Sequence, residues 1–73
     1  MKPNIVKTRI KNMTIANKYE YRIYLVDADK NNWFEAQPIT KGIIRTAESL
    51  PILKIILEND ILMIEKQQQK VRQ

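Results

Sequence analysis

Alternating apolar and polar positions mark two strands in the first third of the chain. In residues 4–11 one side carries Val6, Thr8 and Ile10, and the other side carries Lys7, Arg9 and Lys11. This period of two is typical of a strand with one buried face, so the three cations are expected to line its outer side. Residues 19–26 alternate in the same way, and their second side is also partly apolar, which indicates a central strand.

A polar turn and a returning apolar segment follow the central strand. Residues 27–32 are rich in Asp and Asn, whose short side chains favour turns by hydrogen bonding to their own backbone. Residues 33–36 then predict the second arm of a hairpin, and Pro38 is expected to interrupt it or to mark an edge. Residues 39–45 predict another short strand, in which Gly42 permits a bulge.

One helix is expected over residues 46–59. Ser49 can cap its N-terminus, and Thr46 is an alternative cap one turn earlier. Asn59 can adopt the left-handed conformation that ends many helices. Residues 61–64 form a continuous apolar run, which predicts a strand buried on both faces.

The apolar stripe of the expected helix is wider than one small sheet needs. Three leucines form one stripe and three isoleucines broaden it: Leu50, Leu53, Leu57, Ile52, Ile55 and Ile56. Lys54 and Glu58 are spaced as an exposed ion pair would be. An exposed apolar strip favours contact with another protein, and self-association would cover it equally well.

This order of elements predicts an α+β fold, a small mainly antiparallel β-sheet with one α-helix packed on one face. A chain of 73 residues has room for one modest core. Residues 1–65 are therefore assigned to a single domain, and residues 66–73 to a basic, flexible C-terminal tail.

The chemistry available to the chain is limited by its composition. It has no Cys, no His and one Gly, which argues against zinc ribbons, thiol nucleophiles, imidazole bases and glycine-rich phosphate loops. Asp27, Asp29 and Asn31 match the start of a calcium loop, but Asn32 and Pro38 stand at its decisive positions. We expect a non-enzymatic protein with no catalytic residue, no metal site and no cofactor.

The net charge of +5 is concentrated at the two ends of the chain. Six cations face one acid in residues 1–22, and three cations stand among residues 66–73, whereas the middle is slightly acidic. Such asymmetry suits an anionic partner. The partner-binding candidates are four cations of the first two strands and one of the helix: Lys7, Arg9, Lys11, Arg22 and Lys54.

Three classes of partner remain open on these grounds. An acidic protein surface is favoured because the wide helical stripe also invites protein contact. Nucleic acid is the second, since Tyr24 shares a side with Arg22 and could stack on a base. The third is self-association of a virion structural or assembly protein, although a monomer is expected.

No stretch of the chain reaches the length of a membrane span, and a cytoplasmic location is the default expectation.

In its size, basic character and α+β layout the whole chain resembles the short RNA polymerase-binding transcription regulators of the kind encoded by a Xanthomonas phage. The residues that carry the resemblance are Lys7-Thr8-Arg9-Ile10-Lys11 and Leu50-Pro51-Ile52-Leu53-Lys54. The resemblance implies binding to a large subunit of bacterial RNA polymerase in the host cytoplasm, inhibition of initiation by displacing the promoter-specificity factor, and antitermination. It assigns no contact residues.

Overall fold

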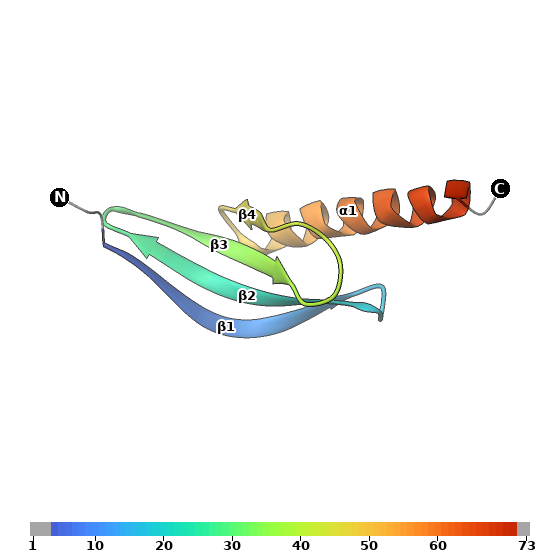
Figure 1. Ribbon diagram of the computed structural model, residues 1–73. Helices are drawn as coiled ribbons and strands as arrows, with labels where there is room; N and C mark the ends of the chain where they lie inside the picture. Colours follow the sequence, from blue (N-terminus) through green and yellow to red (C-terminus); the bar gives the residue numbers. More distant parts are fainter. Residues whose placement is uncertain (1–3, 72–73) are drawn as a thin grey trace.

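The computed structural model describes residues 4–71 as a four-stranded antiparallel sheet followed by one long helix (Figure 1). The elements are β1 (Ile5–Ile15), β2 (Tyr19–Ala28), β3 (Asn31–Pro38), β4 (Arg45–Ala47) and α1 (Leu50–Val71). The strands lie in the order β1-β2-β3-β4, so each pairs with its neighbour in sequence. The α+β fold predicted from the sequence is confirmed.

The first three strands are joined by tight turns in which three residues have a positive φ: Ala16, Asn17 and Asp29. Asn17 has a φ of 54° in the β1–β2 turn, which the amide of Lys18 closes by donating to the carbonyl of Ile15. Asp29 has a φ of 53° between β2 and β3. Asn and Asp occupy this region more readily than most residues, so Asn17 and Asp29 suit their turns, whereas Ala16, with a φ of 56°, has no such preference.

A bulge divides β1 and changes which face its side chains occupy. Arg9 pairs with Tyr24, but the next registered pair is Lys11 with Ile23, so Ile10 is the additional residue. Because side chains alternate with a period of two, one extra residue moves everything beyond it to the opposite face. The prediction that Lys7, Arg9 and Lys11 share one side is therefore wrong, since Lys11 lies on the face that carries Ile23.

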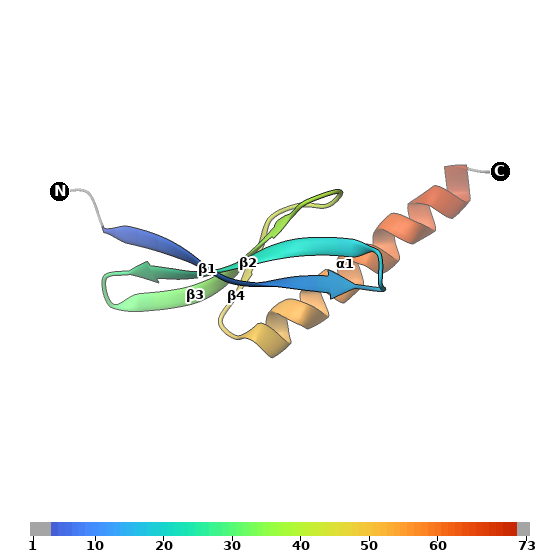
Figure 2. The ribbon, with the colours of Figure 1, turned by 90° about the horizontal axis from the view of Figure 1, so that it is seen from below.

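The first half of β1 also lacks the buried side that its alternation predicts. Val6, Thr8 and Ile10 are all exposed. The beginning of β1 and the β2–β3 turn extend away from α1, as Figure 2 shows. An edge strand that the helix does not reach has nothing to bury its apolar side chains.

The core lies between α1 and the part of the sheet that the helix covers. Leu53, Leu57 and Ile61 form the buried stripe of the helix. They pack against the buried residues of the sheet, which are Ile15, Tyr19, Tyr21, Ile23 and Ala36. The spacing of four along the helix keeps all three side chains on one face, which is the face that meets the sheet.

The helix begins where one of the two expected caps stands and ends far beyond the expected end. Ser49 Oγ accepts a hydrogen bond from the amide of Ile52 at 3.4 Å, whereas Thr46 lies in β4. Asn59 is an interior residue of α1, so both the predicted end and the predicted strand over residues 61–64 are wrong. Ile61 continues the buried stripe one turn after Leu57, which is why the apolar run stays helical.

The predicted domain boundary at residue 65 falls inside α1. Residues 66–71 are helical, and residues 72–73 lie outside the described part of the chain. The flexibility expected of this tail stays a prediction.

A loop connects β3 to β4 where a strand was expected over residues 39–45. Only Arg45 of that range belongs to β4. Gly42 has a φ of +135°, and a Cβ at this position would lie 3.3 Å from the hydroxyl of Tyr21. The glycine is thus required by the backbone conformation and by the close approach of the loop to a core tyrosine.

Candidate binding surfaces

One face of the sheet is not covered by α1 and carries most of the cations predicted to bind a partner. We call it the helix-free face. Its members alternate with the core residues in the strand register and include Lys7, Arg9, Arg22, Tyr24, Val26, Trp33, Glu35 and Gln37. Cations, aromatic rings and one buried carboxylate are therefore brought together on this face.

The charge of Lys7 is balanced by a buried carboxylate on the same face. Lys7 Nζ lies 3.2 Å from Glu35 Oε1 and donates a hydrogen bond to Oε2, also at 3.2 Å. Gln37 Nε2 donates to the same Oε2 at 2.7 Å. The Glu35 side chain is only 9% exposed, so these two donors replace hydrogen bonds to water that burial removes. Lys7 is consequently a weaker candidate for an external anion than its sequence position indicates.

Arg9 and Arg22 are exposed on the same face and lie near Tyr24. Arg9 is the register partner of Tyr24, and Arg22 lies two residues before it on β2. Tyr24 is half-buried, so part of its ring remains accessible. Glu20 is exposed on this face as well and reduces its positive charge.

The remaining two predicted residues lie elsewhere. Lys11 is exposed on the face that carries Ile23, and Lys54 is exposed on α1. The five candidates therefore do not form one continuous surface. The bulge at Ile10 separates Lys11 from Arg9, a displacement that the alternation of the sequence does not reveal.

The outer edge of β1 is unpaired within the described part of the chain. β1 is the first strand in the sheet order, and its eleven residues are hydrogen bonded on one side only, to β2. An unpaired edge of this length can accept an additional strand. Lys7, Arg9 and Lys11 give this edge positive charge on both faces of the sheet.

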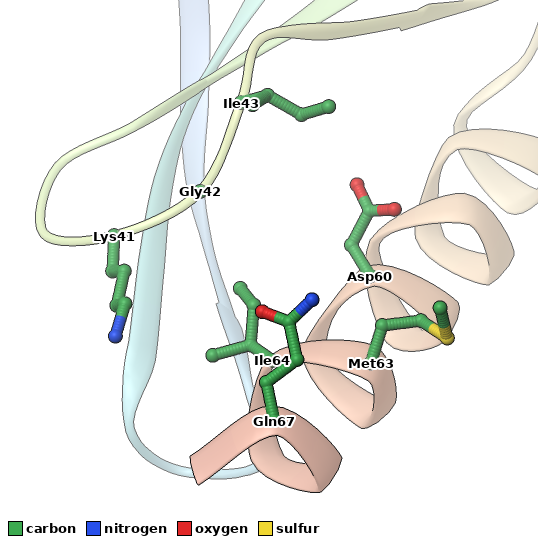
Figure 3. Close-up of a pocket in the computed structure, with 7 residues that line it drawn as sticks. All are labelled: Lys41, Gly42, Ile43, Asp60, Met63, Ile64 and Gln67. Carbon is green, nitrogen blue, oxygen red and sulfur yellow. The ribbon is translucent and has the colours of Figure 1, made fainter. Parts of the chain in front are cut away.

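A second polar contact joins α1 to β4 beside a shallow pocket. Arg45 donates to both carboxylate oxygens of Asp60, from Nε at 2.7 Å and from Nη2 at 3.0 Å. The hydrogen bond to Asp60 raises the pKa of the Arg45 guanidinium above its ordinary value. Asp60 faces the loop at Ile43 across this pocket, with Met63 beside it on the helix (Figure 3). The sequence offered no signal for this pair, because its members stand in different elements fifteen residues apart.

Large apolar side chains are exposed on α1 outside the stripe that packs on the sheet. Ile52, Ile55, Leu62 and Met63 are between 48% and 62% exposed. The wide stripe predicted from the sequence indicated the first two. The other two were missed because residues 61–64 were expected to form a strand.

Comparisons with protein-family models, with curated proteins and with solved structures found no match to this chain. Among residues 4–71 no cluster of three or more side chains suited to a metal ion occurs. Nor does the described helix have the length and apolar character that crossing a membrane requires.

Proposed function

We propose that this protein is a non-enzymatic binding module that adds an acidic segment of a partner protein to the free edge of β1. The observation that carries the proposal is the unpaired edge of β1, which is long, exposed and positively charged on both faces. Backbone hydrogen bonds along such an edge supply affinity, and the side chains that flank it supply selectivity.

The charges of β1 favour one class of partner over another. An added strand would place its side chains beside Arg9 on one face and beside Lys11 on the other. Acidic residues at such positions would be attracted, whereas a second copy of β1 would bring cations against cations. The same cations and the bulge at Ile10 thus discourage pairing of β1 with itself.

The resemblance to phage transcription regulators suggests which partner to test first. Bacterial RNA polymerase is a large protein that such a regulator would meet in the host cytoplasm. On this proposal the β1 edge binds a large subunit of the polymerase, and the outcome is inhibition of initiation together with antitermination.

Single-stranded nucleic acid is the second candidate, because Arg9 and Arg22 lie beside the half-exposed ring of Tyr24. Phosphates could contact the arginines while a base stacks on the tyrosine. Two observations weigh against it. Lys7 is already paired with Glu35, and Glu20 adds a negative charge to the face.

The test is a binding titration of the full chain with purified, nuclease-treated bacterial RNA polymerase. The variant Arg9→Glu/Lys11→Glu should weaken binding at least about tenfold, because it reverses charge on both faces of the edge. The control Lys30→Glu/Lys41→Glu makes the same change in net charge at exposed loop positions and should bind like the natural sequence.

Hydrogen exchange provides the second readout. Backbone amides of β1 that are unprotected in the free protein should become protected in the complex. Equal weakening by both charge variants, or no new protection in β1, would contradict the edge-binding proposal. Binding to single-stranded DNA that falls steeply with salt and requires Tyr24 would instead support the nucleic-acid candidate.

A further inference from the structure

The bulge at Ile10 gives the edge of β1 an unusual arrangement of charge. Arg9 and Lys11 stand two residues apart, a spacing that places both side chains on one face of a regular strand. In the observed register, however, Arg9 pairs with Tyr24 of β2. Lys11 pairs with Ile23, the residue directly before Tyr24. The two cations of the edge therefore point to opposite faces of the sheet.

Both of these cations are available to a partner. Their side chains are exposed. The two ion pairs found among the described residues are formed by Lys7 and by Arg45, so neither Arg9 nor Lys11 belongs to one. β1 is the outermost strand of the described sheet, and a strand added to its edge would lie directly beside both side chains (Figure 1).

The spacing of the cations restricts the spacing of the groups that can meet them. A partner residue beside Arg9 must lie on the helix-free face, and one beside Lys11 must lie on the opposite face. Successive side chains of a strand alternate between faces, so two residues on opposite faces are separated by an odd number of positions. β2 crosses the bulge in a single step, from Tyr24 to Ile23. An added strand that crosses it in the same way would meet the two cations with adjacent residues.

We infer that the β1 edge selects a partner segment with two adjacent acidic residues, one for Arg9 and one for Lys11. This inference rests on the proposed function and deepens it, because it assigns a spacing to the acidic segment. A segment whose acidic residues alternate with neutral ones has them all on one face. Such a segment can meet only one of these two cations.

Alternating acidic residues have one other pair of cations to meet, namely Lys7 and Arg9 on the helix-free face. Lys7 is already engaged, since its Nζ lies 3.2 Å from Glu35 Oε1. A partner carboxylate beside Lys7 would also approach the negative charge of Glu35, and like charges brought together at an interface oppose binding. The pair formed by Arg9 and Lys11 is therefore the stronger site for two acidic residues.

The first experiment compares two short capped peptides that have the same composition, Thr and Val with two Asp residues. The Asp residues are adjacent in one peptide and separated by one Thr in the other. Each is titrated into the full chain, and binding is followed by the amide NMR signals of β1. The peptide with adjacent Asp residues should bind about two- to fivefold more tightly, as expected for one additional cross-strand pair of opposite charge.

The second experiment moves one cation to the other face without changing composition or net charge. The variant Lys11→Asn/Asn12→Lys exchanges two exposed neighbours. Asn12 pairs with Arg22, which stands two residues before Tyr24 on β2 and shares its face. The exchange therefore places the moved lysine on the same face as Arg9. The preference should reverse, so that the peptide with separated Asp residues binds more tightly. An amide NMR spectrum with the strand signals retained shows that the variant is folded.

The outcomes separate this inference from the proposed function. Equal binding of the two peptides to the natural sequence, with new protection of β1 amides, would overturn the spacing and leave edge binding intact. A preference of the natural sequence for separated Asp residues would mean that Lys7 and Arg9 act together, and it would also overturn the spacing. So would an exchange variant whose preference does not reverse. Failure of both peptides to bind would contradict edge addition itself, on which the inference depends.

Discussion

Lys7 and Glu35 form an ion pair that crosses a whole strand of the sheet. Lys7 belongs to β1 and Glu35 to β3, yet Nζ lies 3.2 Å from a carboxylate oxygen. The lysine side chain therefore passes over β2, on the side where Val26 is its register partner. Val26 is buried although α1 does not cover this face, which is consistent with the lysine stem lying over it.

We expect Lys7→Met to destabilise the protein by about 1 kcal/mol, because it leaves the nearly buried Glu35 carboxylate with only one donor. The methionine retains most of the apolar stem, so the lost charge dominates. Urea unfolding measures the change. Lys11→Met, at an exposed cation of the same strand, should change stability by less than about 0.5 kcal/mol. Equal effects of the two variants would show that the pair with Glu35 contributes nothing.

Two leucines of α1 provide a direct comparison of its two apolar sides. Leu57 is fully buried and Leu62 is 58% exposed. Leu57→Ala should cost about 3 kcal/mol through lost burial and the cavity left behind, and Leu62→Ala less than about 0.5 kcal/mol. Both are measured by urea unfolding at low protein concentration, where self-association does not contribute. A large loss for Leu62→Ala in the monomer would mean that the outer side of α1 is covered by this chain itself.

Gly42→Ala should destabilise the protein by about 1 to 2 kcal/mol, because its φ of +135° strains any residue with a Cβ. The new methyl group would also lie 3.3 Å from the hydroxyl of Tyr21. Removing that hydroxyl should relieve the contact but leave the backbone strain. Thermal unfolding should therefore show that Gly42→Ala costs less in a Tyr21→Phe background than in the natural sequence. Identical costs would mean that backbone strain accounts for the whole effect.

Tyr21 should make the protein sensitive to alkali. Burial raises the pKa of its hydroxyl above 10.0, and the negative charge of Asp60 and the neighbouring Tyr19 raise it further. The unfolded chain therefore loses this proton at lower pH than the folded protein does. The free energy of unfolding should be unaffected below pH 10 and should fall as the pH rises above it.

The variant Tyr21→Phe separates this effect from general alkaline unfolding. No hydrogen-bond partner for the Tyr21 hydroxyl occurs among the described residues. Its removal should change stability near neutral pH by less than about 1 kcal/mol, because no hydrogen bond is lost. The fall above pH 10 should become smaller. Tyr24→Phe serves as the control, since it leaves Tyr21 in place and should retain the full fall. Indistinguishable pH profiles for the two variants would contradict the assignment to Tyr21.

Local patterns in the sequence were sufficient for the fold class, for the approximate positions of β1, β2 and β3, and for the beginning of α1. The alternation over residues 19–26 predicted β2 as a central strand, but it did not indicate which side the helix covers; in the structure that side carries the buried Tyr19, Tyr21 and Ile23. Ser49 predicted the beginning of α1. These features depend on interactions within a few residues, namely the period of side chains along a strand and the bonding of a cap to the next turn.

The binding surfaces could be predicted only in part. The wide apolar stripe and the cations of β1 were evident in the sequence, but their arrangement was not. A bulge at Ile10 depends on how β1 pairs with β2, and it transferred Lys11 to the other face. The pairing of Lys7 with Glu35 depends on two strands that lie on either side of β2.

The length of α1 shows most clearly the difference between what local sequence predicts and what tertiary packing determines. An apolar run at residues 61–64 is compatible with a buried strand or with a further helical turn, and its own composition does not decide between them. The sheet decides, because its covered face extends far enough to bury Ile61 one turn beyond Leu57. Periodicity and capping are local and can be recognised in the chain itself. Register, helix length and the pairing of distant charges are determined by packing between segments that meet only in the folded protein.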